Sequence, residues 1–158
     1  MEKFDFIEMK VPAKAEYVGV VRLSVSGIAN RMGFSYEDIE DLKVAVAEAM
    51  TNVVEHAYTD DVEGEVTLGF GVYEERLEVM VADRGDSFNL REIKNEIGPF
   101  KENESIETLR EGGFGLFLIN ALMDKVEINN EYGVIVLMTK YLDEVEVDFD
   151  DGQISSRL

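Results

Sequence analysis

The stretch that decides the fold is SYEDIEDLKVAVAEAMTNVVEHA, residues 35–57. Ser35 followed by Asp38 is typical of a helix start, because a serine hydroxyl accepts a hydrogen bond from a backbone N–H of the first turn. Beyond this cap, apolar residues recur at the three- and four-residue spacing of one helix face: Leu42, Val46, Ala49, Met50, Val53 and Ala57. We therefore expect a long helix that ends near Ala57 and buries this apolar face.

The flanking sequence predicts one more long helix, one short helix and several strands. Helical spacing covers residues 14–32, where Gly33 closes the helix, and a short helix is expected over residues 115–123. Apolar and polar residues that alternate at period two predict a hairpin across the Glu74–Glu75 turn. The expected strands cover residues 3–11, 66–72, 77–81, 126–130 and 134–142.

A chain of 158 residues fits one domain, which we place at residues 1–142. The stretch from Gly85 to Gly115 is rich in charge, Gly and Asn, as is typical of a functional lid or a partly disordered segment. Residues 143–158 are acidic and are expected to form a solvated tail.

The charge balance restricts the possible partners. Fifteen Lys and Arg against 34 Asp and Glu give a net charge of −19, which disfavours direct binding of nucleic acid and suits a partner with a basic face. The absence of cysteine excludes disulfides, cysteine-based zinc sites and thiol nucleophiles. No apolar run is long enough to span a membrane and the N-terminus lacks a signal-peptide layout, so we expect a cytoplasmic protein.

Three polar residues on the long helix form the first candidate site. Glu48, Asn52 and His56 are spaced four and four, so they share one side of the helix at the margin of its apolar face. Polar groups at such a margin need partners, because an unpaired buried group costs about 1–3 kcal/mol. The spacing fits side chains that are hydrogen-bonded to neighbouring backbone as well as it fits side chains that bind a ligand.

The second candidate is Asp83, which continues the inward face of the strand 77–81. An ionised acid there is costly without hydrogen-bond donors, and an adenine amino group would be a suitable one. The alternative is an Asp that caps the following loop. Gly85 permits a positive φ or the close approach of a flat ligand.

The third candidate is the stretch Gly112-Gly113-Phe114-Gly115-Leu116 at the entry to the short helix. Glycines let backbone N–H groups approach phosphate oxygens, and a helix N-terminus favours negative charge. Alone, the pattern also fits a simple turn. It matches neither a Rossmann fingerprint nor a Walker loop.

Together the three candidates resemble the N, G1 and G2 boxes of the GHKL (histidine-kinase-like) ATPase superfamily. The matching residues are Glu48-x-x-x-Asn52-x-x-x-His56, Asp83-x-Gly85 and Gly113-x-Gly115-Leu116. Over residues 6–142 the chain is further similar to the bacterial serine-protein kinases that are anti-sigma-B factors. That similarity is carried by EMKVP at 8–12, Ala57-Tyr58, VADRGDSF at 81–88 and MTKYL at 138–142.

The resemblance implies an α/β (α+β) two-layer sandwich of the GHKL (Bergerat) type, with ATP held between the helices and a mixed sheet. It implies that Glu48 is the general base for a serine hydroxyl and that Asn52 is a ligand of Mg²⁺. It places residues 86–111 in an ATP lid. The nucleotide-binding residues that it implies, besides Asn52, are His56, Asp83, Gly85, Arg110, Gly113, Gly115 and Leu116.

The resemblance also implies a function and partners. The chain would be an ATP-dependent serine kinase that holds a stress sigma factor inactive and phosphorylates its anti-anti-sigma antagonist, and it would form a homodimer. One alternative is a sigma-binding module with a vestigial nucleotide pocket, although the presence of Glu48 argues against this. The other is a histidine-kinase catalytic domain acting in trans, since the chain has a single histidine and no room for a dimerisation helix.

Overall fold

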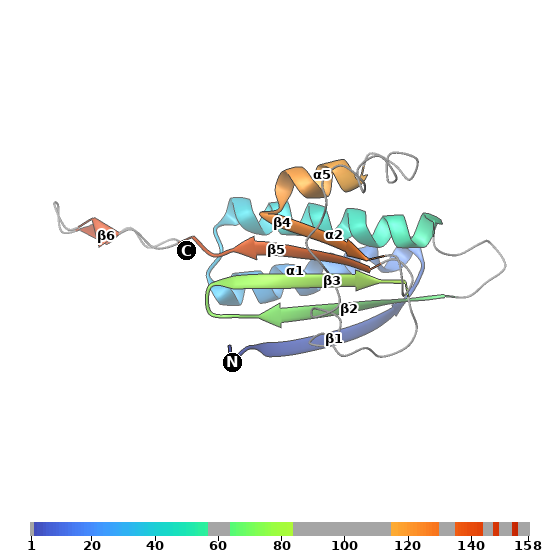
Figure 1. The fold of residues 1–158 in the computed structure, drawn as a ribbon, viewed down its shortest axis with the longest axis horizontal. Helices are drawn as coiled ribbons and strands as arrows, with labels where there is room; N and C mark the ends of the chain where they lie inside the picture. The colour runs from blue at the N-terminus through green and yellow to red at the C-terminus, as the bar shows by residue number, and fades with distance from the viewer. Residues whose placement is uncertain are drawn as a thin grey trace.

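The computed structural model describes residues 2–56, 64–83, 115–129, 135–143, 147–148 and 153–154. Helices lie on one face of a five-stranded sheet, so the fold has two layers, as the resemblance implied (Figure 1). The helices are α1 (Val18–Met32), preceded by the 3-10 turn η1 (Ala15–Tyr17), α2 (Tyr36–His56) and α5 (Gly115–Leu122). The sheet strands are β1 (Asp5–Pro12), β2 (Glu65–Val72), β3 (Arg76–Ala82), β4 (Lys125–Asn129) and β5 (Ile135–Tyr141).

The strand order is β1-β2-β3-β5-β4, and all four pairings within this sheet, among the described strands, are antiparallel. This corrects the expected mixed sheet. The pairs β2–β3 and β4–β5 each join consecutive strands of the chain, and consecutive strands joined by a short connection pair antiparallel. Two further strands, β6 (Val147–Asp148) and β7 (Gln153–Ile154), pair with each other in the segment expected to be a tail. No helix within the described ranges is long and apolar enough to cross a membrane.

The predicted helix signals are confirmed. Gly33 ends α1 with a φ of 91°, a left-handed conformation that glycine adopts without steric cost. The backbone N–H of Asp38 donates to Ser35 Oγ at 3.2 Å, so Ser35 is the N-terminal cap of α2. The predicted end near Ala57 lies one residue beyond the observed end at His56.

The main core lies between the sheet and the helices. On α2, Leu42, Val46, Ala49, Met50 and Val53 are all at most 3% exposed, as their spacing predicted; Ala57 lies outside the described residues. They pack against inward-facing residues of the central strands and of α1: Leu68, Phe70, Leu77, Val79, Val81, Val21, Val25 and Ala29. Each fully buried side chain of leucine size contributes about 1.5–3 kcal/mol.

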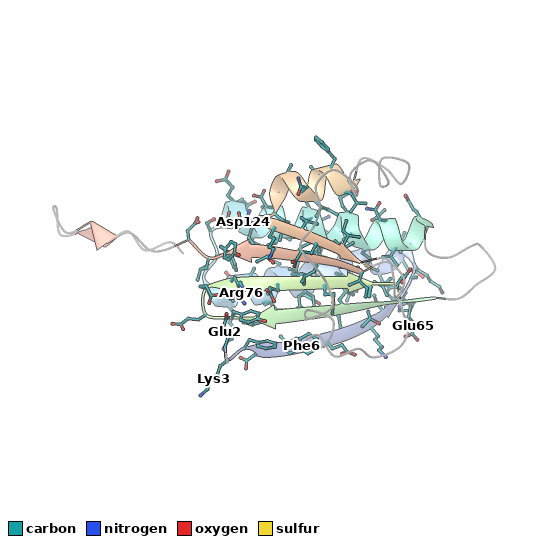
Figure 2. The ribbon with its side chains drawn as sticks, viewed as in Figure 1. Glu2, Lys3, Phe6, Glu65, Arg76 and Asp124 are labelled. Atoms are coloured by element: carbon teal, nitrogen blue, oxygen red, sulfur yellow. The ribbon has the colours of Figure 1, made fainter. Side chains whose placement is uncertain are left out.

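A smaller apolar cluster lies on the opposite face of the sheet, around Met80 and Leu137. Phe6 of β1 lies on this face against Gly69 (Figure 2). A Cβ at Gly69 would come within 2.9 Å of the Phe6 ring, so the strand needs glycine there to let the aromatic ring approach.

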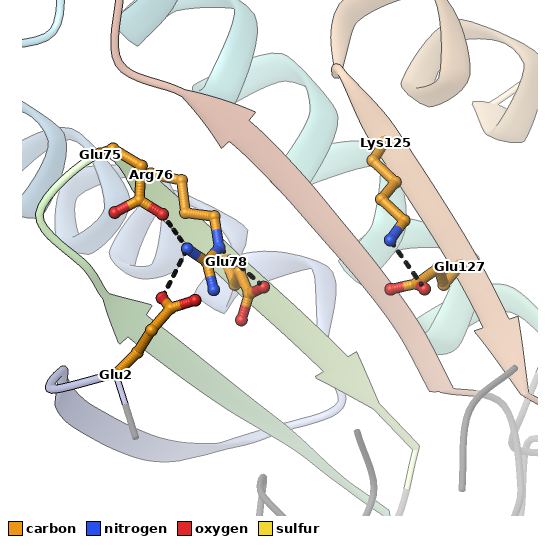
Figure 3. Close-up of polar contacts among 6 residues, drawn as sticks. All are labelled: Glu2, Glu75, Arg76, Glu78, Lys125 and Glu127. Carbon is orange, nitrogen blue, oxygen red and sulfur yellow. Dashed lines mark hydrogen bonds and ion pairs between the residues drawn. The ribbon is translucent and has the colours of Figure 1, made fainter. Parts of the chain in front are cut away.

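Arg76, at the start of β3, joins the N-terminal segment to this second face (Figure 3). Its guanidinium pairs with Glu2 at 2.8 Å, with Glu78 at 3.2 Å and with Glu75, and it lies 3.7 Å above the Tyr73 ring. Burial opposes the charged form, but hydrogen bonds to Glu2 and Glu78 outweigh it and raise the pKa of Arg76 above its ordinary value. Arg76 therefore stays charged, and it neutralises the buried Glu78.

We predict that Arg76→Met lowers the free energy of unfolding by about 2 kcal/mol, because it leaves the Glu78 carboxylate buried without its cation. The matched control is Lys125→Met, which removes the 3.3 Å pair with Glu127 at a side chain that is 52% exposed. That exposed pair should contribute at most about 0.5 kcal/mol. Urea unfolding of both variants checks the difference, and equal losses would contradict it.

Candidate functional site

Three of the predicted site segments meet at one end of the molecule. The C-terminal end of α2, the carboxyl end of β3 and the N-terminal end of α5 lie at the right-hand end of Figure 1. Helix α5 packs along α2, and α2 contacts β3. Elements that are far apart in the sequence are therefore held together by the core at this end.

The residues from α2 lie at the margin of its buried face. Glu48 and Asn52 are both half-buried and lie one helical turn apart on the same side. The Nδ2 atom of Asn52 is buried and has no hydrogen-bond partner within the described part of the chain. His56 is the last residue of α2, and its side chain lies outside the description.

The Nδ2 atom of Asn52 bears on the two interpretations of this set. If neighbouring backbone in the described part of the chain satisfied it, Asn52 Nδ2 would have an acceptor there, and it has none. A buried donor without a partner costs about 1–3 kcal/mol, so such a group in a folded protein calls for an explanation. A ligand with acceptor oxygens at this position would supply the missing partner.

The other segments contribute an acid and a helix N-terminus. Asp83 follows the last residue of β3 directly and is half-buried, after the fully buried Val81 and Ala82. Gly115 is the first residue of α5, and Leu116 packs against the main core. Gly85, Arg110, Gly113 and the lid expected at 86–111 lie outside the described residues.

The chemistry of this end of the molecule suits a ligand that carries both a base and phosphates. The helix N-terminus of α5 provides backbone N–H donors and a partial positive charge. Asn52 offers an amide N–H₂ to an oxygen acceptor and an amide oxygen to a hard cation. Within the described ranges, no group of three or more His, Cys, Asp or Glu side chains is arranged to hold a metal ion.

Sequence reasoning did not single out Lys140 or Arg76, although the structure buries Lys140 and half-buries Arg76. Lys140 is 8% exposed, on the face of β5 that carries the apolar residues Val136 and Met138. A lysine in register with two apolar core positions was the available signal, because alternation places it inside. For Arg76 the local sequence offers the acids Glu75 and Glu78, but its third partner, Glu2, lies 74 residues away.

Comparison with protein families identifies a match over residues 11–140 to the histidine kinase-like ATPase domain. This range includes every residue that was assigned to the site from the sequence.

Known proteins of high similarity extend over nearly the whole chain. The chain is 65% identical to the serine-protein kinase RsbW of Oceanobacillus iheyensis, over 99% of each chain. It is 55% identical to the serine-protein kinase RsbW of Bacillus mycoides, over 99% of this chain and 97% of the relative. A Mycobacterium tuberculosis protein with RsbU and RsbW domains shares the fold with a TM-score of 0.62 at 20% identity, over 89% of this chain and 33% of that one.

We predict that Asn52→Leu does not destabilise the ligand-free protein and raises its free energy of unfolding by up to about 1 kcal/mol. The substitution removes an unpartnered buried donor, and leucine is also the better helix former. The control is Val53→Ala at the adjacent core position, which should lose about 2 kcal/mol with its two methyl groups. Urea unfolding without nucleotide measures both, and a loss of 1 kcal/mol or more in Asn52→Leu would show that the amide is satisfied in the free protein.

Proposed function

The chain belongs to the histidine kinase-like ATPase family and, within it, to the RsbW serine-protein kinases; on this premise we propose that it phosphorylates an anti-anti-sigma protein on serine and holds a stress sigma factor inactive. It is thus an ATP-dependent protein serine kinase. The identity of its substrate and of its sigma factor are the parts that we propose.

The observation that supports a nucleotide at the candidate site is the buried, unpartnered amide of Asn52. Phosphate oxygens would accept from its Nδ2, and its amide oxygen would be a ligand for Mg²⁺ bound to the same phosphates. The residues present therefore fit Mg-ATP. When bound, it supplies the terminal phosphoryl group and the cation that neutralises the charge developing on the phosphates.

Glu48 is the residue that we propose as general base. It lies one turn before Asn52 on the same side of α2, so its carboxylate and the phosphate-binding amide are held by one rigid helix. The carboxylate would accept the proton of a substrate serine hydroxyl as its oxygen attacks phosphorus. A partly exposed position suits this role, because the hydroxyl of a second protein must reach it.

The remaining contacts follow the same assignment. We propose that Asp83, at the end of the central strand, accepts from the adenine amino group and that Gly85 makes room for the base. Backbone N–H groups at Gly113 and Gly115 would donate to the phosphates. The other proposed contacts are His56, Arg110 and Leu116. Residues 86–111 would form the lid of a single domain at 1–142, and residues 143–158 would form a tail.

The proposed partners are two proteins and a second copy of the chain. A net charge of −19 suits a sigma factor, whose DNA-facing surfaces are basic, because complementary charge steers association and suppresses wrong partners. Since sigma factors act on RNA polymerase, we also propose that the protein works in the cytoplasm. The names of the relatives state a serine-protein kinase. The anti-anti-sigma substrate and the homodimeric state are proposals for this chain.

We predict that Glu48→Gln binds Mg-ATP with unchanged affinity but loses phosphotransfer by at least about 100-fold, as expected for loss of a general base. The assay follows γ-labelled phosphate from Mg-ATP to candidate anti-anti-sigma proteins, and calorimetry gives the affinity. The matched control is Glu55→Gln, an exposed acid on the same helix, which should keep full transfer.

Each outcome of this assay has a distinct meaning. Acid-stable label on serine that is lost only in Glu48→Gln supports the proposed function and the base together. Unchanged transfer by Glu48→Gln would refute the base. ATP binding without any labelled serine would favour the non-catalytic module, and acid-labile label on histidine would favour a histidine kinase.

We predict that Asp83→Asn weakens ATP binding about tenfold, because it replaces a charged acceptor by a neutral amide and removes about 1.5 kcal/mol. Calorimetry with Mg-ATP measures the change. Asp5→Asn, at an exposed residue of β1, is the control and should bind as the wild type does. An ATP affinity of Asp83→Asn equal to that of the wild type would contradict the assignment of Asp83 as the acceptor for the adenine amino group.

A further inference from the structure

The α5 helix is fastened at its C-terminal end by a buried cation, Lys140 of β5. The residue lies on the helix-facing side of the sheet and is 8% exposed. An ammonium group so far from water is costly unless acceptors surround its three N–H groups. A purely apolar side chain would fill the same space at lower cost, so the charge calls for a specific explanation.

The contacts of the Lys140 ammonium join two helices. Its Nζ donates to the carbonyl oxygen of Leu122, the last residue of α5, at 2.7 Å. It also pairs with Asp41 at 3.6 Å and with Asp38 at 3.9 Å, both near the start of α2. The cation at the carbonyl end of α5 and the acid Asp38 in the first turn of α2 are each favourable for the helix dipole.

The strand residues on either side of Lys140, Thr139 and Tyr141, form hydrogen bonds with Asp124, just after the end of α5. The backbone N–H of Asp124 donates to the Thr139 carbonyl at 3.0 Å, and the Tyr141 N–H donates to Asp124 Oδ2 at 2.7 Å. Three consecutive residues of β5 thus form hydrogen bonds with the chain at the C-terminal end of α5. Figure 2 shows Asp124 on the left-hand side of the sheet and helices, whereas α5 begins toward their right-hand side.

The far end of this short helix is the part of the candidate site that would receive phosphates. Helix α5 has eight residues, so it is about 12 Å long. Only about two turns separate Gly115, at its start, from the Leu122 carbonyl that accepts from Lys140. Ile119, in the middle of α5, is fully buried. A shift at the Leu122 end therefore moves or tilts the Gly115 end as well.

From this geometry we propose that Lys140 is a positioning residue for ATP binding. By holding the C-terminal end of α5 to β5 and to α2, it sets the place of the N-terminal end relative to Asn52, which α2 carries. The inference rests on the proposed function of the site. Displacements of about 1 Å at a reacting centre can cost about 100-fold, so loss of this fastening should be measurable in the affinity for ATP.

The test compares variants of the full chain by calorimetry with Mg-ATP, which needs no phosphoacceptor, at a temperature where circular dichroism shows each variant to be folded. Lys140→Met keeps the apolar stem and removes the charge and donors, and its Kd for ATP should rise about tenfold. Lys140→Arg restores a cation with donors and should return the Kd to within about threefold of the wild type.

The matched control is Lys43→Met. Lys43 is a lysine of α2 that pairs with Glu40 at 3.1 Å on the same helix. This variant loses an ion pair without touching the end of α5, so its Kd should equal that of the wild type.

A purely structural role for Lys140 would lower the melting temperature but leave the Kd of the folded protein unchanged, and that result overturns the proposal. If Lys140→Met does not fold, Lys140→Gln decides. It removes the cation that donates to the Leu122 carbonyl and pairs with Asp38 and Asp41, and it leaves a polar side chain at the same position. A raised Kd then supports the proposal, and an unchanged Kd overturns it.

The same data separate this inference from the proposed function. A wild-type chain that binds ATP but labels no serine counts against the kinase proposal alone, since the Kd comparison still stands. A wild-type chain that does not bind ATP overturns both.

Discussion

Helix α2 packs on the sheet and against the neighbouring helices α1 and α5, and six of its side chains are at most 3% exposed there: Leu42, Ala45, Val46, Ala49, Met50 and Val53. Because an apolar stripe of this length cannot slide or rotate without exposing itself, packing sets the position of the helix. The fixed helix therefore limits where the polar side chains at the margin of this face can lie. Glu48 and Asn52 are consequently presented in one fixed arrangement, which is what binding and catalysis require of a scaffold.

That rigidity explains why a buried donor can remain without a partner. A flexible loop would turn the amide of Asn52 toward water, whereas a helix held by its core keeps Nδ2 buried. The unpaired donor costs about 1–3 kcal/mol of stability. The free energy gained by burying the apolar side chains of α2 is several times larger. Under the proposed function, the stability lost at this one position provides an ordered group for a ligand, a trade often seen at functional sites.

Local patterns predicted the elements well because each one has its own signal along the chain. Helical spacing placed α2, Ser35 marked its start, and Gly33 marked the end of α1. The same patterns could not give the strand order or the antiparallel pairing, since those depend on contacts between distant segments; the mixed sheet expected from resemblance is not seen in the described strands.

The candidate site was predictable only in part for the same reason. Spacing put Glu48 and Asn52 on one side of a helix and put Asp83 at the end of a strand, but each pattern alone fitted a structural role too. Only the fold places those segments at one end of the molecule, and only the atomic structure shows that Asn52 Nδ2 is buried without a partner among the described residues. Lys140 carried a signal in its register with apolar residues, but its acceptors on α2 and α5 belong to other parts of the chain.

The ion-pair clusters around Arg76 and Lys140 also bear on how the large negative charge should be interpreted. Arg76 lies among three carboxylates and Lys140 between two, so some acids serve internal ion pairs and say nothing about a partner. Those two clusters hold five carboxylates against two cations and thus carry only three of the nineteen excess negative charges. Most of the excess is therefore not explained by these internal pairs. Because unbalanced charge destabilises a compact chain through self-repulsion, a role outside the fold is the simpler explanation, and a basic protein surface is the partner that it suits.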